Sequence, residues 1–231
     1  MAKHGGRSVS SSCGSADVLE ALGVNVNVTP AQVANAVEEI GIGFMFAPNH
    51  HSAMKHAAPV RRELGVRTLF NLLGPLTNPA NAKRQIMGVF SPALTVKLAH
   101  VLQQLGSEHV IVVCGADGMD EISFTGDSHI AELKNGQVTE YTINPSQFGM
   151  PTHQLASIQI DNAEQSKAMI LAVLKGELGA ARDIVLLNAG AAIYVAGLAD
   201  SLAAGISKAG EVIDQGFALA KLNALQQYAA G

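Results

Sequence analysis

Apolar and polar residues recur with two different periods along this chain, and the first is that of helices. Apolar side chains follow at helical spacing over residues 31–40, directly after Thr29, a favourable N-cap, and Pro30, which suits the first helical turn. A shorter helix is expected over residues 18–22, and the chain from residue 164 onward is Ala-rich and mostly helical in pattern. Helices are therefore predicted toward both ends of the chain.

The middle of the chain has the pattern of strands. Residues 85–90 and 109–114 are short apolar runs, typical of buried strands, and a helical segment that ends at Gly106 separates them. A strand, a helix and a second strand at this spacing predict a βαβ unit with parallel pairing. Farther along, Asn135 and Gly136 form a hairpin signal between two more strand-like runs. The pattern predicts an α/β protein whose central, mostly parallel sheet is flanked by helices.

Composition narrows the class of protein. Of the 231 residues, 48% are hydrophobic and 15% are charged, which is typical of a globular protein with a buried core. The net charge of −4 comes without a basic stripe, so no nucleic-acid partner is expected. No apolar stretch is long enough for a membrane span. Cys13 and Cys114 lack the close spacing of a redox or zinc pair, which favours a reduced, cytoplasmic protein.

One segment concentrates positive charge, glycine and serine. Lys3, His4 and Arg7 lie in it, and no acidic residue appears before Asp17. Glycines let backbone N–H groups approach an oxyanion, hydroxyls add donors, and a helix N-terminus follows directly. The segment therefore predicts a loop, with no strand ahead of it, that binds a phosphorylated ligand. A solvated tail is the alternative interpretation.

A second polar segment contains adjacent histidines. His50 and His51 are neighbours, but neighbours on a helix point apart, and no His-x-x-x-His spacing with a nearby acid supports a metal site. A helix terminus, a satisfied core histidine and a solvated basic face are competing interpretations of this segment.

An acidic pair follows the second predicted strand. Asp120 and Glu121 lie beyond the carboxyl end of that strand, where open α/β sheets bind ligands. Adjacent carboxylates there suit Mg²⁺, and a solvated Asp-Gly turn is the alternative. Taken with the phosphate loop, the pair implies a Mg²⁺-phosphate ligand and nucleotidyl, phosphoryl or phosphoribosyl chemistry.

Four runs of residues, taken in order, resemble the anthranilate phosphoribosyltransferases. They are Lys3-His4-Gly5-x-Arg7-x-Val9-Ser10-Ser11-x-x-Gly14-Ser15-Ala16-Asp17-Val18-Leu19-Glu20, Phe46-Ala47-Pro48-x-x-His51-x-Ala53-Met54-Lys55, Arg67-Thr68-x-Phe70-Asn71-x-Leu73-Gly74-Pro75-Leu76-Thr77-Asn78-Pro79 and Gly118-Met119-Asp120-Glu121. Their order and spacing hold across essentially the whole chain. The first and last runs also occur in related nucleoside phosphorylases, whereas the third is characteristic of this family.

The resemblance implies a nucleoside phosphorylase/phosphoribosyltransferase-type catalytic domain that acts in tryptophan biosynthesis. A phosphoribosyl group would pass from 5-phosphoribosyl 1-diphosphate to the amino group of anthranilate, and diphosphate would leave. The residues that would hold the phosphoribosyl diphosphate are Lys3, His4, Gly5, Gly6, Arg7, Ser8, Val9, Ser10, Ser11 and Ser15. Asp120 and Glu121 would ligate Mg²⁺. Anthranilate would contact Gly6, His51 and Arg61, and no separate acid or base is assigned.

The chain departs from the family pattern in two ways. The family usually has Asn where Gly6 stands here. It also has an N-terminal helical domain, a first sheet strand and a Gly-Thr-Gly-Gly-Asp loop ahead of the residues that match. We therefore expect residues 1–231 to be an incomplete catalytic domain with little transferase activity alone, and residues 29–65 to form helices that would pack on the helical domain. The full-length family is expected to be homodimeric.

Two other functions stay open on the sequence. A pyrimidine nucleoside phosphorylase would share the fold and a similar loop, but would need phosphate as its nucleophile and lacks the Leu-Gly-Pro-Leu-Thr-Asn-Pro run. A non-catalytic phosphate-binding or nucleic-acid-binding homologue is opposed by the net charge of −4 and by the intact Asp120-Glu121 pair.

Overall fold

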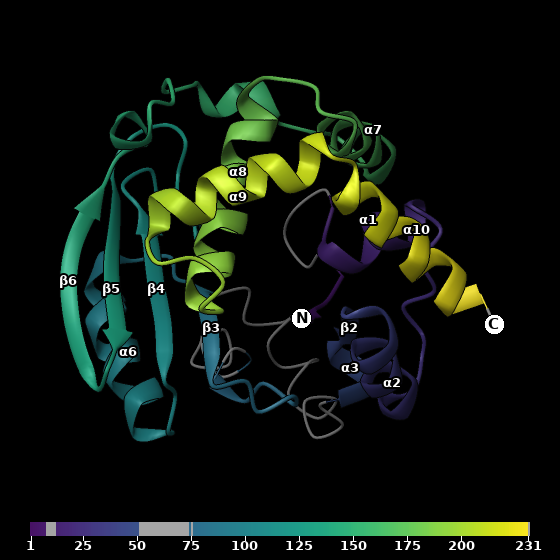
Figure 1. Cartoon of the computed structure of the whole chain (residues 1–231), viewed down its shortest axis with the longest axis horizontal. Coiled ribbons are helices and arrows are strands. Elements are labelled where there is room, and N and C mark those ends of the chain that lie inside the picture. The colour runs from purple at the N-terminus through teal and green to yellow at the C-terminus, as the bar shows by residue number, and fades with distance from the viewer. Residues whose placement is uncertain (8–12, 51–73, 75, 231) are drawn as a thin grey trace, which may run out of the picture. The chain divides into compact units, whose positions relative to one another are not determined.

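The computed structural model describes residues 1–7, 13–50, 74 and 76–230. Its strands and longer helices are, in chain order, β1 (Ala2–Gly5), α1 (Ser15–Ala21), α2 (Pro30–Ile40), β2 (Gly43–Phe46), α3 (Ala47–His50), β3 (Arg84–Gly88), α6 (Thr95–Gln104), β4 (His109–Gly115), β5 (Ser128–Lys134), β6 (Gln137–Ile143), α7 (Ala163–Leu174), α8 (Ala180–Val195), α9 (Leu202–Asp214) and α10 (Phe217–Ala230) (Figure 1). No helix in these described ranges has the length and apolarity needed to cross a membrane.

The chain divides into two units. Unit 1 comprises Met1–Asn81, Ile160–Ala172 and Phe217–Gly231. Unit 2 comprises Ala82–Gln159 and Val173–Gly216. Of the helices expected over residues 29–65, α2 and α3 belong to unit 1, while residues 51–65 lie outside the described residues. Their packing on a further helical domain stays a prediction.

Unit 1 is built on a parallel pair of strands. β1 pairs with β2 along its whole length, and β2 is buried at every residue. Phe44 and Phe46 of β2 pack with Ala16 and Val26 in one apolar cluster. Gly5 of β1 permits this approach, because a Cβ there would lie 3.1 Å from the Phe44 ring. Backbone pairing with β2 thus orders the first residues as a strand, and the expectation of a loop with no strand ahead of it is wrong.

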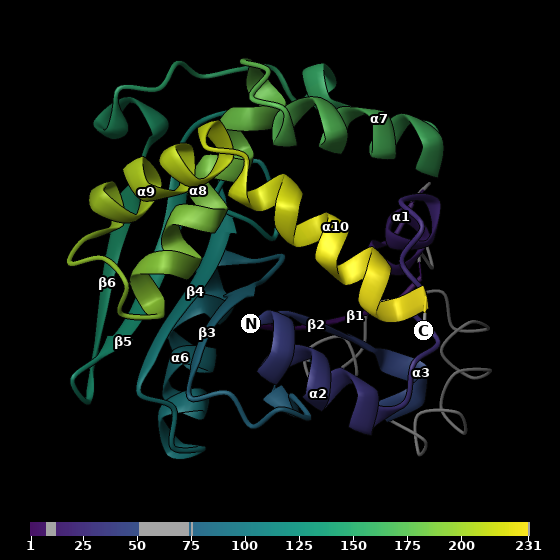
Figure 2. The ribbon, with the colours of Figure 1, turned by 45° about the vertical axis from the view of Figure 1, so that its right-hand side comes forward.

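Local sequence accounts for the bounds of α2. Thr29 accepts a hydrogen bond from the backbone N–H of Gln32, which confirms the predicted N-cap. The Gln32 side chain also accepts one from the N–H of Thr29, which completes a capping box. Gly41 ends the helix with φ of 76°, the left-handed conformation that glycine favours. α10 lies beside α2, and Lys221 Nζ donates to the carbonyl of Ile40 at 2.6 Å, which satisfies a helix C-terminus with a cation (Figure 2).

Unit 2 contains a four-stranded sheet in the order β3-β4-β5-β6. β3 and β4 are parallel and α6 connects them, so the predicted βαβ unit is confirmed. β5 and β6 add antiparallel strands through a turn at Asn135 and Gly136, whose φ values of 52° and 74° suit a two-residue hairpin. The α/β fold class is confirmed, with parallel pairing at β1–β2 and β3–β4 and the hairpin at the sheet edge.

Helices cover both faces of this sheet. Ile111 and Val113 of β4 pack in a cluster with Leu187 of α8, and successive strand residues point to opposite faces, so Val110 and Val112 face the side on which α6 packs (Figure 1). β4 is thus buried along its whole length. Because β4 is buried, the position of the first residue of the loop between β4 and β5 is fixed by the sheet.

Candidate functional site

The predicted phosphate loop begins in β1 and ends in α1, both in unit 1. β1 contributes Lys3, His4 and Gly5, and the Lys3 side chain is exposed. Gly6 and Arg7 follow the strand, and Ser15 is exposed at the start of α1. The remaining predicted ligands, Ser8, Val9, Ser10 and Ser11, lie outside the described residues.

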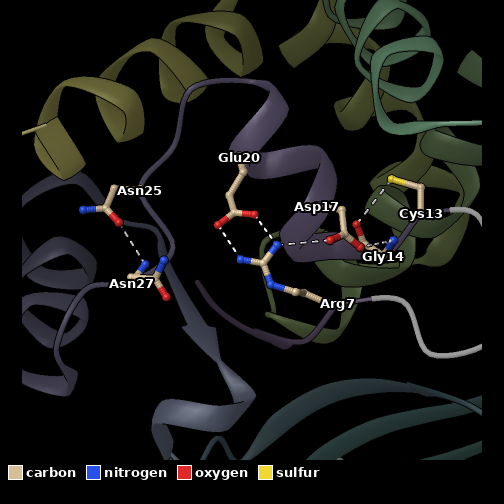
Figure 3. Close-up of polar contacts among 7 residues, drawn as sticks. All are labelled: Arg7, Cys13, Gly14, Asp17, Glu20, Asn25 and Asn27. Atoms are coloured by element: carbon tan, nitrogen blue, oxygen red, sulfur yellow. Dashed lines mark hydrogen bonds and ion pairs between the residues drawn. The ribbon is translucent and has the colours of Figure 1, made fainter.

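Hydrogen bonds join the two ends of this loop. The backbone N–H of Ala16 donates to the carbonyl of Gly6 at 3.1 Å. Asp17 accepts from the N–H of Gly14 at 2.8 Å through one carboxylate oxygen, and from Arg7 Nη1 at 3.3 Å through the other (Figure 3). The chain before the loop and the chain after it are therefore held together at the N-terminus of α1.

The Arg7 side chain is directed at carboxylates. Its Nη2 donates to Glu20 Oε1 at 2.7 Å, and its Nη1 donates to the other carboxylate oxygen of Glu20 (Figure 3). The hydrogen bonds to Glu20 raise the pKa of Arg7 above its ordinary value, so the guanidinium stays charged. Its central carbon also lies 5.6 Å from the centre of the Phe46 ring. The Arg7 side chain, which is expected from the sequence to bind a phosphate, thus pairs with Glu20 and Asp17.

The acidic pair lies in unit 2, in the loop between β4 and β5. Asp120 and Glu121 are both exposed, whereas Ile122 and Ser123 directly after them are buried. The structure thus places the two carboxylates where the sequence predicts them, beyond the carboxyl end of a buried strand. The buried residues Ile122 and Ser123 hold the loop between β4 and β5 against the core of unit 2.

Asp117 organises the turn that precedes the pair. Its carboxylate accepts hydrogen bonds from the N–H of Met119 at 3.0 Å and from the hydroxyls of Ser123 and Thr125, both at 2.7 Å. Burial by itself would raise the pKa of Asp117, but these hydrogen bonds outweigh it and hold the pKa below its ordinary value. Asp117 was not singled out from the sequence, although an Asp followed by Gly118 is a turn signal.

Gly88 brings β3 against the backbone of the acidic pair. A Cβ at this position would lie 1.6 Å from the carbonyl oxygen of Asp120, which no side chain could occupy without displacing the loop. Glycine is therefore required here for a close approach between two backbones. The backbone of Asp120 is confined by this contact on one side and by the Asp117 turn on the other.

The carboxylates of Asp120 and Glu121 suit a hard divalent cation that takes its remaining ligands from a bound substrate or from water. In the described part of the chain, no group of three or more His, Cys, Asp or Glu side chains is arranged to hold a metal ion. Asp120 and Glu121 together offer carboxylate oxygens from one exposed loop. An ion bound by so few protein ligands takes the rest from water or from phosphate oxygens, which is the usual coordination of Mg²⁺.

The predicted anthranilate contacts are only partly described. His51 and Arg61 lie outside the described residues. Gly6 is described, and a Cβ added to it would meet no atom of the described residues within 4 Å. The space directly around a Cβ at this position is therefore open within the described part of unit 1.

Comparison with known proteins identifies the family. Residues 1–219 match the family model described as the glycosyl transferase family, a/b domain. An anthranilate phosphoribosyltransferase of Methylobacillus flagellatus is 66% identical over 226 residues, which cover 98% of this chain and 66% of that protein. The crystal structure of the Thermus thermophilus enzyme is 43% identical with a TM-score of 0.93, and the match covers all of this chain and 68% of that one. This chain belongs to the anthranilate phosphoribosyltransferase family.

A more distant member of the anthranilate phosphoribosyltransferase family extends the comparison. The Saccharomyces cerevisiae enzyme, solved in complex with PRPP (5-phosphoribosyl 1-diphosphate) and Mg, is 27% identical with a TM-score of 0.89, and the match covers 99% of this chain and 64% of that one. The same enzyme has also been solved with 4-fluoroanthranilate. The chain spans 66% of the length of its Methylobacillus relative. The family and fold class expected from the sequence are confirmed.

Proposed function

We propose that the protein containing this chain transfers the phosphoribosyl group of 5-phosphoribosyl 1-diphosphate to the amine of anthranilate. The products are N-(5-phosphoribosyl)anthranilate and diphosphate, and the reaction belongs to tryptophan biosynthesis. The 66% identity to the Methylobacillus enzyme carries this proposal. The yeast complexes with PRPP and Mg and with 4-fluoroanthranilate support the two substrates and the ion.

The phosphate loop is the proposed site of the phosphoribosyl diphosphate. Lys3 supplies an exposed ammonium group, and Ser15 supplies a hydroxyl at the N-terminus of α1, which also favours an anion. Because Glu20 and Asp17 hold the Arg7 guanidinium, we propose that Arg7 acts through its backbone N–H and by shaping the loop. The other proposed ligands are His4, Gly5, Gly6, Ser8, Val9, Ser10 and Ser11.

Asp120 and Glu121 are the proposed ligands of Mg²⁺. Their exposure, and the confinement of their backbone by Gly88, fit an ion that is shared with a phosphorylated substrate. When bound, the ion stabilises the negative charge that develops on the departing diphosphate. The two carboxylates are thereby assigned to holding this ion and not to proton transfer.

The reaction is a displacement at the anomeric carbon of the ribose. The bond from this carbon to the diphosphate oxygen breaks, its bond to the anthranilate nitrogen forms, and the nitrogen then releases a proton. Lys3 and the loop N–H groups stabilise phosphate charge, and the planar fork of Arg61 suits the anthranilate carboxylate. No general base is assigned, because the amine proton becomes acidic only as the new bond forms.

Two further expectations belong to this proposal. A cytoplasmic location is supported by the biosynthetic role of the relatives' reaction and by two cysteines without the spacing of a redox pair. We also propose that the full-length protein is a homodimer. Analytical ultracentrifugation of that protein would test this, and a monomer at micromolar concentration would contradict it.

Product analysis tests the proposed function. The protein that contains this chain is incubated with anthranilate, PRPP and Mg²⁺, and the mixture is analysed by mass spectrometry. We expect N-(5-phosphoribosyl)anthranilate and diphosphate, and no product when PRPP or Mg²⁺ is omitted. Phosphorolysis of thymidine together with unchanged anthranilate would overturn the proposal in favour of a nucleoside phosphorylase.

A further inference from the structure

An asparagine on a neighbouring helix holds the backbone next to the acidic pair. Asn188 of α8 accepts a hydrogen bond from the N–H of Ile122 at 2.9 Å and donates one to the carbonyl of the same residue, also at 2.9 Å. Ile122 directly follows Glu121 and is 1% exposed. One side-chain amide therefore satisfies both backbone groups of a buried residue, as a strand partner would.

The Asn188 amide is itself oriented by its helix. Its Nδ2 also donates to the carbonyl of Ile184, one turn earlier in α8, at 3.0 Å. α8 in turn packs closely on α9, because Gly190 and Gly205 let the two backbones meet: a Cβ on Gly205 would lie 2.2 Å from the carbonyl oxygen of Gly190. The Asn188 side chain is thus held by its own helix, and that helix is closely packed on α9.

The same helix holds the loop at a second point. Asp183 of α8 pairs with His153 Nε2 at 2.6 Å, and the backbone N–H of His153 donates to the carbonyl of Phe124 at 3.0 Å. The His153 ring also lies against the Phe124 ring, with centres 5.9 Å apart. α8 therefore reaches residues 122 and 124, on the C-terminal side of the acidic pair.

The backbone is therefore held by hydrogen bonds on both sides of the acidic pair. The Asp117 turn fixes the chain before Asp120, and Asn188 fixes it after Glu121. The two carboxylates themselves are exposed. Such a segment keeps its backbone in place while its side chains face solvent, which reduces the ordering that a bound cation would otherwise require.

We propose that Asn188 is a positioning residue for the cation site: it presets the backbone of Asp120 and Glu121 so that both carboxylates reach one divalent ion. This inference rests on the proposed function, which assigns Mg²⁺ to the pair. Groups that hydrogen-bond directly to a metal ligand typically change metal affinity by about 10- to 100-fold when removed, and Asn188 acts one residue farther away, so we expect the lower end of this range. A purely structural role for Asn188 would lower stability and leave the affinity of the folded protein for the ion unchanged.

Metal binding by the full protein tests the inference. Mn²⁺ replaces Mg²⁺ as a probe, and its dissociation constant in the presence of PRPP is measured by electron paramagnetic resonance. The variants are Asn188→Ala and Asn188→Gln, which keeps the amide but lengthens the side chain, with Asn223→Ala on the exposed side of α10 as the matched control. Thermal unfolding of each variant reports the folded fraction.

We expect the dissociation constant for Mn²⁺ to rise by about tenfold in Asn188→Ala and by less in Asn188→Gln, with no change in Asn223→Ala. Raising the Mg²⁺ concentration should restore turnover in Asn188→Ala, because the ligands themselves remain. If Asn188→Ala does not fold, the same comparison is made with Asn188→Gln.

The outcomes separate this inference from the proposed function. Unchanged Mn²⁺ affinity in folded Asn188 variants would overturn the inference while the function stands. Unchanged affinity in Asp120→Asn and Glu121→Gln would instead overturn the assignment of the ion to the pair.

Discussion

The two loops that carry the proposed ligands are held in different ways. The two ends of the phosphate loop are joined by one backbone hydrogen bond, from Ala16 to Gly6, and by the ion pairs of Arg7 with Glu20 and Asp17 at the surface. The acidic loop is held by close backbone packing at Gly88 and by hydrogen bonds from part-buried or buried groups. Exposed ion pairs are weak and are screened by salt, whereas salt does not screen the close contact between two backbones at Gly88. We therefore expect salt to weaken the contacts that join the two ends of the phosphate loop, and to leave those that hold the acidic loop unchanged.

The largest effect is expected where that packing is tightest. Gly88→Ala puts a Cβ where the Asp120 carbonyl lies, so the loop must move, and displacements of this size lower turnover by about 100-fold. Overpacking of this kind also lowers the free energy of unfolding by about 1–3 kcal/mol. Gly126→Ala is the matched control, because a Cβ there meets nothing within 4 Å. Equal kinetics and unfolding curves for both variants would show that the contact does not confine the pair.

A smaller effect is expected from the Asp117 turn. Asp117→Asn removes one carboxylate acceptor and should weaken Mg²⁺ activation by about tenfold. Because the pKa of Asp117 in the folded protein lies below its ordinary value of 3.8, its stabilisation is present above that value and is lost as the pH falls through the lower folded pKa.

Thermal unfolding between about pH 6 and about pH 2 checks this sign. Wild type should be more stable than Asp117→Asn at the upper end, and the difference should shrink toward the lower end. The exposed Glu140→Gln on β6 serves as control. A difference that grows as the pH falls would contradict the role of the ionised Asp117.

The exposed ion pair is expected to matter less. Glu20→Gln removes the charged partner that accepts two hydrogen bonds from Arg7 and leaves the contact with Asp17, so the ends of the phosphate loop are held less firmly. We expect the KM for PRPP to rise a few-fold, and this rise to shrink in high salt because salt already screens the pair. Glu38→Gln on the exposed face of α2 is the control. A lower KM for PRPP in Glu20→Gln would mean that Glu20 competes with the substrate for Arg7.

The smallest effect on the fold is expected at Gly6. The family resemblance leads us to expect Asn there, and a Cβ at Gly6 meets no atom of the described residues within 4 Å, so Gly6→Asn should leave the unfolding temperature unchanged. We expect the KM for anthranilate to fall by roughly the few-fold that one added hydrogen bond gives. Steady-state kinetics at saturating PRPP measures it, and an unchanged KM would assign anthranilate contact at this position to the backbone.

Short sequence patterns were sufficient to predict those elements that are determined by residues close together in the sequence. The capped helix after Thr29, the hairpin at Asn135 and Gly136, and the βαβ unit all follow from short patterns and are confirmed. Asp120 and Glu121 could be located because they are adjacent and follow a strand. Their roles stay predictions that the proposed experiments test.

Contacts between distant residues could not be predicted in the same way. β1 is polar in sequence, and its strand partner β2 begins only at Gly43. The hydrogen bonds between Asn188 and Ile122 join residues that are 66 positions apart. The one sequence signal for them is a polar residue, Asn188, within an otherwise apolar stretch of α8. The need for Gly88 likewise appears only when β3 and the acidic loop are seen together.

The most direct test is the loss of anthranilate fluorescence with PRPP, followed as Mg²⁺ is titrated into the full protein and into its Asp120→Asn, Glu121→Gln double variant. We expect wild type to consume anthranilate only when Mg²⁺ is present, and the double variant to be at least about 100-fold slower at every Mg²⁺ concentration. Consumption by the double variant at the wild-type rate, or none by wild type, would contradict a Mg²⁺-dependent phosphoribosyl transfer at this site.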